Sequence, residues 1–428
     1  MSGVIRVLVV GTADTKADEL LFVQRCIAEA GALAVIMDVG VGPAKAPVHI
    51  RNSEVAAAAG VPLDTVATSG DENVAMATMA IGAVCIARSL AGEGRIDALL
   101  ALGGSMGTDL ALDVAAVLPL GMPKMIVSTI AFSHLIPPER LAPDLTMILW
   151  AGGLYGLNGI CRSVLSQAAG AVCGSARGVV PSRSERPMIG ITSFGKSCLR
   201  YMVELVPALE ARGYEPAVFH ATGIGGRAFE ALAQQGRFAA VFDFAIQEVT
   251  NHHFGSVVSA GPERLTAAGR AGIPQLVAPG AMDLVDVAGW QDFPPRLRGR
   301  EFHAHNRLLS SAKTNAVERC EVARDVAARL GRSRSPVAFL LPLHGFHEWD
   351  REGGPLRDDA ALAACVRTFR ETVKPPTQLF EVDAHINDSA FVQRALSVFD
   401  GWVRTGIVPS PGQCATQRRD VSAESIDA

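Results

Sequence analysis

The chain has 428 residues, of which 49% are hydrophobic and 19% are charged, so extended disorder is excluded for most of its length. This length predicts two or three domains, and 42 glycines with only 6% aromatic residues favour α/β domains with many strand-to-helix turns. The net charge of −4 lacks the basic excess that marks nucleic-acid-binding proteins.

The cysteines and the N-terminus indicate a cytoplasmic protein. The eight cysteines show no C-x-x-C spacing and lie mostly in apolar segments, so we expect free, buried thiols in a reducing compartment. The chain enters an apolar run almost at once, without the charged region and cleavage site of a signal peptide. We find no apolar run of the about 18 residues that a membrane span needs, and therefore expect no membrane contact.

Apolar runs and helix-compatible segments alternate along the first half of the chain. Val4–Val10 is apolar apart from Arg6, which is typical of a buried parallel strand. A helix pattern from Ala17 to Ala30 and a second apolar run, Ala32–Val39, complete a βαβ unit. Further strands are expected at 96–102, 123–127 and 145–150, and further helices at 52–59, 71–91, 109–118 and 158–173.

The segment 174–187, GSARGVVPSRSERP, is rich in Gly, Ser, Arg and Pro and is predicted to be an interdomain linker. After it the alternation of strand and helix patterns restarts. Strands are expected at 188–193, 214–220, 238–243, 273–278, 300–305, 337–341 and 379–382, and helices at 198–212, from 223, and at 261–271, 314–330 and 389–402. We therefore predict two α/β domains with doubly wound parallel sheets, over residues 1–173 and 188–408, and a loose polar tail over 409–428.

The turn Gly103-Gly104-Ser105-Met106-Gly107-Thr108 lies between the apolar run 96–102 and a helix pattern. A strand, a glycine turn and a helix together present backbone N–H groups and a helix N-terminus to an anion. The turn matches neither the G-x-G-x-x-G fingerprint nor a P-loop, so a tight turn without a ligand is an equal alternative.

Ligands of open parallel sheets bind outside the carboxyl ends of the strands. In the first domain this rule selects Gly and hydroxyl donors, one lysine and two acids, which suit phosphate and ribose groups. The residues selected are Gly11, Thr12, Asp14, Thr15, Lys16, Asp38, Gly103, Gly104, Ser105, Gly107, Thr108, Ser128 and Thr129.

The two acids of this set have alternative roles. Asp14 is placed to hold Mg²⁺ through water, whereas helix capping is the structural alternative for Asp14 and Thr15. Asp38 is placed to bond a ribose hydroxyl, whereas loop capping is its structural alternative.

In the second domain the same rule selects His, Asp and Glu side chains, the residue types of acid/base or metal sites. They lie at 243–248 and 383–388, at His220, His303, His344 and the pair His305-Asn306, and beside Ser193 and Lys196. No known metal-ligand spacing occurs, and a structural role is the alternative for each histidine. The catalytic candidates are Asp383, His385, Glu248 and Asn306.

Nucleophilic catalysis finds little support in the sequence. No G-x-S-x-G elbow occurs, which argues against a serine nucleophile. Cys198 follows Lys196 at the expected start of a helix, where a thiolate would be favoured, and is kept as a lesser alternative.

Several motifs together resemble the Tm-1-like family, also called UPF0261, over about residues 4–405. They are GTADTK at 11–16, LGGSMGTDLA at 102–111, PKMIVST at 123–129, GLNGICR at 156–162, FHATGIGGRAFE at 219–230, SAGPERLTAAGRAGIPQ at 259–275, HN at 305–306 and DAHINDSAF at 383–391.

The resemblance implies two Rossmann-like domains, ATP binding in the N-terminal domain and a homodimer. Carried over by motif, Thr12, Asp14, Thr15 and Lys16 would line the ATP site together with Gly103–Thr108 and Ser128-Thr129. The chain departs from the family pattern at residues 131–134, 244–247, 313 and 344–349. The first departure affects part of the expected phosphate loop, and the others affect the second domain.

Three functions follow as hypotheses. The first is an ATP-dependent enzyme acting on a small organic acid in the interdomain cleft, facing Asp383, His385, Asn306 and Glu248. The second is a non-catalytic ATP-binding module that orders the domains for a protein partner. The third is a metal-dependent hydrolase or lyase of the second domain. The sequence leaves open which reaction, substrate and metal apply.

Overall fold

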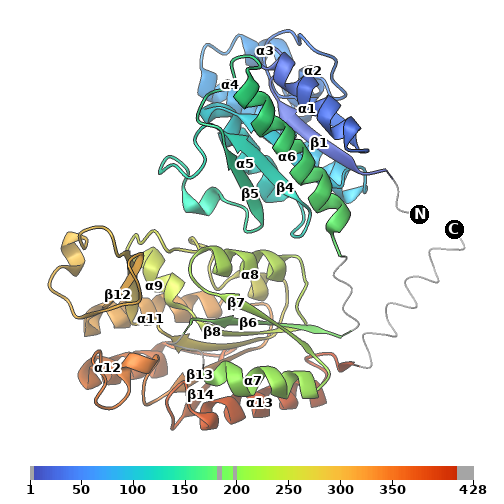
Figure 1. Cartoon of the computed structure of the whole chain (residues 1–428). Helices are drawn as coiled ribbons and strands as arrows, with labels where there is room; N and C mark the ends of the chain where they lie inside the picture. Colours follow the sequence, from blue (N-terminus) through green and yellow to red (C-terminus); the bar gives the residue numbers. More distant parts are fainter. Residues whose placement is uncertain (1–3, 181–185, 196–199, 412–428) are drawn as a thin grey trace, which may run out of the picture. The chain divides into compact units, whose positions relative to one another are not determined.

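The computed structural model describes residues 4–180, 186–195 and 200–411. The chain forms two compact units that divide between residues 181 and 182 (Figure 1). Each unit is a parallel sheet covered by helices on both faces, which confirms the predicted α/β class with two Rossmann-like domains.

The first unit is built on a five-stranded sheet with the order β2-β1-β3-β4-β5, in which every pair is parallel. Its strands are β1 (Arg6–Gly11), β2 (Leu33–Asp38), β3 (Ala98–Gly103), β4 (Lys124–Ser128) and β5 (Leu145–Leu149). Its helices are α1 (Ala17–Glu29), α2 (Asn52–Ala58), α3 (Leu63–Ala67), α4 (Glu72–Gly92), α5 (Ser105–Val117) and α6 (Gly159–Gly178), with a 3₁₀ turn η1 (Pro138–Arg140).

Alternate side chains of each strand enter two different cores, because successive residues point to opposite faces of a sheet. Leu8 and Val10 of β1 pack with α2, α4 and α5. Val7 and Val9 pack with Leu20 of α1 and with α6. Both faces are apolar, which explains why these strands read as continuous hydrophobic runs in the sequence.

Helix α4 is long and apolar enough to cross a membrane by length and composition, so the expectation that no segment meets this test is wrong for α4. In the first unit its Met79 and Ala83 lie in the core between α2 and α5. A Cβ on Gly82 would lie 1.8 Å from the carbonyl oxygen of Val55 in α2. The two helices therefore pack backbone against backbone at this point.

The second unit contains a six-stranded parallel sheet with the order β14-β13-β9-β8-β6-β7. Its strands are β6 (Met188–Ser193), β7 (Glu215–His220), β8 (Ala240–Ala245), β9 (Gln275–Gly280), β13 (Val337–Pro342) and β14 (Gln378–Val382). Its helices are α7 (Arg200–Ala211), α8 (Ile224–Gln234), α9 (Gln247–His253), α10 (Ala267–Arg270), α11 (Ala316–Leu330), α12 (Asp359–Thr372) and α13 (Ser389–Arg404), with 3₁₀ turns η2 (Pro295–Leu297) and η3 (Glu348–Asp350).

Helices cover both faces of this sheet as well (Figure 1). Helices α7 and α13 pack on one face, with Leu205 and Phe399 against Phe242 of β8. On the other face, α11 and α12 pack against Phe339 of β13, and Phe229 of α8 packs against Val241 of β8.

A small antiparallel sheet is inserted between β9 and α11. Its order is β10-β12-β11, with β10 (Leu284–Ala288), β11 (Phe302–Ala304) and β12 (Leu309–Lys313). Residues 300–305 were predicted to be a strand, but β10 and β12 were not predicted. Helix α12 was also missed, and the helix expected at 261–271 is limited to α10.

The boundary regions differ in detail from the sequence prediction. Helix α6 continues to Gly178, so the first five residues of the predicted linker, 174–178, are helical. The rest of that linker overlaps residues 181–185, and the predicted tail overlaps 412–428, both of which lie outside the described residues.

The close approach of α2 and α4 gives a stability prediction. Gly82→Ala forces a Cβ into the backbone of α2 and should destabilise the protein by about 2–3 kcal/mol. Gly92→Ala lies on the same helix and meets no atom within 4 Å, so it should stabilise by about 0.5–1 kcal/mol. Urea unfolding of both variants checks this, and equal midpoints would contradict it.

Candidate functional site

The first sheet changes its winding direction between β1 and β3. From β1 the chain moves outward to β2, then returns to β3 on the other side of β1 and continues to β4 and β5. The turns that follow β1 and β3 therefore lie side by side at the carboxyl edge, with helices leaving to opposite faces. This switch point is where open parallel sheets bind ligands.

The two glycines of the turn after β3 differ in what surrounds them. A Cβ on Gly103 would lie 2.4 Å from the carbonyl carbon of Gly107, so strand-to-helix packing excludes a side chain there. A Cβ on Gly104 would have one neighbour within 4 Å, Thr129 Oγ1 at 3.9 Å. Internal packing therefore does not explain Gly104, and its backbone is open to approach from outside.

Helix α5 begins at Ser105 directly after this open glycine. No side chain caps its N-terminus, and no acidic residue lies in its first turn. Ser105 is exposed. The N-terminus of α5 thus offers backbone N–H groups, one hydroxyl and the positive end of the helix dipole to an anion.

Thr108 and Ser128 lie behind this surface. Both are fully buried, and their hydroxyl oxygens are 2.7 Å apart. The Ser128 hydroxyl also accepts a hydrogen bond from the backbone N–H of Ile130. These two predicted ligand residues join α5 to β4, whereas Thr129 is only half-buried and borders Gly104.

The two predicted acids shape the turn that follows β1. Asp38 is buried, and its Oδ1 accepts hydrogen bonds of 2.9 Å from the backbone N–H groups of Ala13 and Gly40. Burial raises the pKa of Asp38 above its ordinary value, although these two bonds lower it. Asp14 Oδ2 accepts a bond of 3.0 Å from Gly42. The contacts of Asp38 are therefore those of the structural alternative, loop capping.

The remaining residues of this turn are more accessible. The hydroxyls of Thr12 and Thr15 are 2.6 Å apart, and Thr15 is exposed. Lys16 Nζ lies 5.8 Å from the ring centre of Tyr155, which is 96% exposed. An ammonium group and an aromatic face thus meet at the rim of the switch point.

Tyr155 belongs to the loop that connects the edge strand β5 to α6. This loop contacts the first turn of α1. Leu154 is buried in the core that α1 and α6 share. The backbone N–H of Gly156 donates a 2.8 Å hydrogen bond to Glu19, which is itself buried. The loop is anchored on both sides of Tyr155, so the backbone that carries the exposed ring is held beside Lys16.

The four catalytic candidates of the second unit are not brought together. Asp383 is exposed and lies 2.9 Å from Nε2 of His344. His385 is buried against Asp350, and Asn306 accepts hydrogen bonds from Leu308 and Leu309 of its own turn. Glu248 is buried elsewhere. Lys196 and Cys198 lie outside the described residues.

Glu248 belongs to a buried cluster around Arg264. The guanidinium of Arg264 contacts Asp243 at 2.5 Å, Glu248 at 2.7 Å and Glu230 at 3.1 Å, and it is fully buried. Glu248 also accepts hydrogen bonds from the backbone N–H groups of Gly223 and Gly226 at the start of α8. These contacts join β8, α8 and α9, which indicates a structural role for Glu248.

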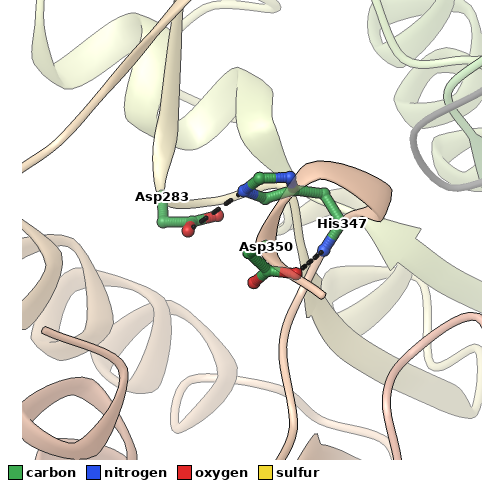
Figure 2. A group of neighbouring side chains, drawn as sticks. All are labelled: Asp283, His347 and Asp350. Atoms are coloured by element: carbon green, nitrogen blue, oxygen red, sulfur yellow. Dashed lines mark hydrogen bonds and ion pairs between the residues drawn. The ribbon is translucent and has the colours of Figure 1, made fainter. Parts of the chain in front are cut away.

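Asp283, His347 and Asp350 form the group that most resembles a metal site among the described residues (Figure 2). His347 Nε2 lies 3.3 Å from Asp283 Oδ2, and Arg319 Nη1 lies 3.1 Å from the same oxygen. Burial raises the pKa of Asp283, but His347 and Arg319 outweigh it and hold that pKa below its ordinary value. The guanidinium already supplies the positive charge that a cation would bring.

The third member of the group is also engaged. Asp350 accepts hydrogen bonds from the backbone N–H groups of Phe346 and His347 and from Nε2 of His385. The backbone N–H of Trp349 donates to His347 Nδ1, so Nε2 carries the proton that faces Asp283. These donors fit a network that fixes the loop after β13 better than they fit a metal site.

Comparisons with known proteins agree over both units. The N-terminal domain model of the uncharacterised protein family UPF0261 matches residues 5–181, and the C-terminal domain model matches residues 186–403. The chain belongs to the UPF0261 family. A UPF0261 protein of Brucella melitensis is 56% identical over 405 residues, covering 94% of this chain and 97% of that protein.

More distant relatives align over most of this UPF0261 chain. A UPF0261 protein of Clostridium tetani is 35% identical and covers 90% of this chain and 96% of its own length. The ToMV resistance protein Tm-1 of Solanum lycopersicum is 28% identical over 92% of this chain, which corresponds to 55% of that protein. Among solved structures, Escherichia coli ADP-heptose lipopolysaccharide heptosyltransferase II aligns over 93% of this chain and 100% of its own with 11% identity and a TM-score of 0.20, which is too low to carry an argument.

Several polar residues of the UPF0261 chain were missed by the sequence analysis. Arg264 and Arg319 are buried charges that only the tertiary structure reveals. Asp286 and Ser311 lie on the two strands that were not predicted, and both are buried. Alternation of these polar residues with Val285, Val287 and Ala312 was the available signal, since a period of two marks a two-faced strand.

The Arg264 cluster gives a pH prediction. Burial raises the pKa of Glu248 from 4.5 to about 7. The charge of Arg264 and the hydrogen bond from Gly223 lower this pKa, but burial outweighs them. Between these two values the unfolded chain loses a proton that the folded UPF0261 protein keeps, so the unfolding free energy falls as pH rises.

Glu248→Gln removes this proton, so its stability relative to the parent protein should rise by on the order of 2 kcal/mol between pH 5 and pH 8. Urea unfolding at several pH values measures the difference. The exposed control Glu352→Gln should follow the parent at every pH. A Glu248→Gln profile parallel to that of the parent would contradict the prediction.

Proposed function

We propose that the first unit binds ATP at the switch point between β1 and β3. The observation that carries the proposal is the open backbone at Gly104 in front of the uncapped N-terminus of α5. Phosphate groups are suited to such a site, because backbone N–H groups and the helix dipole both favour negative charge. The Tm-1-like resemblance independently supports ATP as the anion.

In this proposal different neighbouring residues contact the phosphates and the nucleobase. Ser105 and Thr129 donate hydroxyl hydrogen bonds to the phosphates beside Gly104, and Lys16 supplies a positive charge from the turn after β1. Tyr155 contacts the nucleobase from the far side of Lys16. Thr108, Ser128 and Asp38 hold the turns in place from behind.

Mg²⁺ fits this arrangement through Asp14. Asp14 Oδ1 is buried without a hydrogen-bond partner, while Oδ2 binds Gly42. Within the described part of the chain, one carboxylate oxygen therefore lacks a hydrogen donor, which a water molecule on an Mg²⁺ ion that neutralises the phosphates would supply. The homodimer and the cytoplasmic location stay proposals that rest on the family resemblance and on the composition.

The second part of the proposal is that the bound ATP serves an enzyme reaction on a small organic acid. The separate positions of Asp383, His385, Asn306 and Glu248 favour a nucleotide-binding module over catalysis by these four residues. Catalysis in the second unit therefore needs other residues. A metal-dependent reaction at Asp283, His347 and Asp350 is disfavoured by Arg319.

Gly104→Val tests the phosphate site. The added side chain enters open space, so the fold should persist, but it blocks the approach to α5. Affinity for ATP with Mg²⁺ should fall at least about tenfold by isothermal titration calorimetry. Gly174→Val of α6 also meets no atom within 4 Å and should keep full affinity. Equal affinities of the two variants would place the ligand elsewhere.

Tyr155→Ala tests the nucleobase contact separately. Loss of one base–aromatic stack costs about 1–3 kcal/mol, so ATP affinity should fall about tenfold or more. Inorganic tripolyphosphate lacks the base, and its affinity should stay the same. Tyr155→Phe keeps the aromatic face and should bind ATP normally. If ATP and tripolyphosphate weaken equally in Tyr155→Ala, the residue has another role.

A further inference from the structure

One face of the inserted sheet β10-β12-β11 packs into a small apolar core, and the other carries two buried polar residues between Leu284 and Leu309. Val285, Val287 and Ala312 form the apolar face with Leu297 and neighbouring phenylalanines. Asp286 and Ser311 occupy the opposite face in one row of the sheet, and they are 2% and 0% exposed. Burial of such groups costs free energy unless they are hydrogen-bonded, so their partners identify what the face is for.

Asp286 is held by donors on two sides. Its Oδ1 accepts hydrogen bonds from Gln247 Nε2 at 2.7 Å and from Ser311 Oγ at 2.5 Å. Its Oδ2 accepts from Asn251 Nδ2 at 3.2 Å, and its backbone N–H donates to the same side chain. Helix α9 and strand β12 thus fix the carboxylate in position.

The chain of hydrogen bonds continues to an exposed imidazole. Ser311 donates its hydroxyl proton to Asp286, so its oxygen is left to accept a hydrogen bond from His305 Nε2 at 2.9 Å. Nε2 therefore carries the ring proton, and Nδ1 carries a lone pair. His305 is exposed as a residue, and Nδ1 is the ring nitrogen that the bond to Ser311 leaves free for a small molecule.

The ring of His305 is oriented by aromatic neighbours as well. It packs edge-on against Trp349 at 4.9 Å and against His303 at 5.0 Å, while His303 stacks on Trp349 at 4.0 Å. Burial, His303 and His220 lower the pKa of His305 below its ordinary value. The ring of His305 is thus held by a hydrogen bond and by two aromatic neighbours, although it lies on an exposed turn.

The place of this group in the fold is that of a ligand site. Gln247 and Asn251 follow strand β8, and Trp349 lies in the loop after β13. Both segments leave the carboxyl edge of the six-stranded sheet, where α/β proteins bind their ligands. The buried network fixing the loop after β13 also fixes Trp349, because His347 accepts a hydrogen bond from its N–H.

We propose that His305 is the proton-transfer group of a second small-molecule site, oriented by Asp286 through Ser311. The substrate is a small metabolite with a removable proton on a hydroxyl or on a carbon next to a carbonyl. That proton passes to Nδ1, and its electron pair stays on the substrate atom. The imidazolium keeps the hydrogen bond from its Nε2–H group to the Ser311 hydroxyl and returns the added proton from Nδ1 to the product.

The assignment does not depend on ATP binding. It replaces Asp383, His385, Glu248 and Asn306 as the acid/base candidate of the second unit. It also explains why Asp286 and Ser311 are polar at buried positions of a sheet. A role limited to stabilising the turn 305–309 would need neither Asp286 nor Ser311. Backbone hydrogen bonds to Leu309 and the side chain of Asn306 already close that turn.

Carbethoxylation by diethyl pyrocarbonate, followed residue by residue with mass spectrometry, tests the proposal on the full chain. The free nitrogen of a neutral imidazole attacks a carbonyl carbon of the reagent and takes up its carbethoxy group, while ethyl carbonate leaves. His305 should react at Nδ1, with a half-maximal rate below pH 6.5, its ordinary pKa. In Ser311→Ala the rate should fall roughly fivefold, the equivalent of one hydrogen bond of about 1 kcal/mol.

Ser310→Ala is the matched control, because Ser310 is also buried on β12 but neighbours Val287 rather than Asp286 in the sheet. It should leave the rate for His305 unchanged. Nitrogen-15 NMR of the parent protein should show His305 protonated at Nε2. An Nδ1-protonated ring, or equal rates in Ser311→Ala and the parent, would overturn the proposal.

Discussion

The order of the strands is the constraint on which the candidate sites depend. In each unit the first strand lies inside the sheet, and the chain winds outward from it in one direction and then in the other. Right-handed crossovers then place the helices of the two winding directions on opposite faces of the sheet. In the first unit the turns after β1 and β3 become neighbours although they are far apart in sequence. Glycine-rich turns gain a ligand-binding geometry only through this arrangement.

The sequence predicted the parallel sheets because strands buried on both faces read as continuous apolar runs. It predicted less about the sites, because a hydroxyl or carboxylate at a strand end looks the same whether it faces a ligand or a neighbouring backbone. Thr108 and Ser128 bind each other, and Asp38 binds Ala13 and Gly40. Gly104, in contrast, was selected as a strand-end glycine and stays a predicted ligand residue. Its openness distinguishes it from Gly103.

The second unit shows how burial separates structural from functional polar groups. Arg264 with its carboxylates, and Asp283 with Arg319 and His347, are groups of opposite charges that lie against one another out of solvent. The Asp283 group is held by charge, because neither oxygen of Asp283 accepts a hydrogen bond from a described residue. The Asp286 network instead ends on the exposed ring of His305. The sequence could not reveal this difference, since β10 and β12 are only five residues long and β10 contains a single polar residue. The partners of Asp286 come from α9 and β12, which pairing in three dimensions brings together.

A crystal structure of the full chain with a non-hydrolysable ATP analogue and Mg²⁺ tests the central claim most directly. The account predicts phosphate density at the N-terminus of α5, against Gly104 and Ser105, with the base beside Tyr155. Phosphate density at the second unit, or crystals grown at saturating analogue without density at α5, would contradict it.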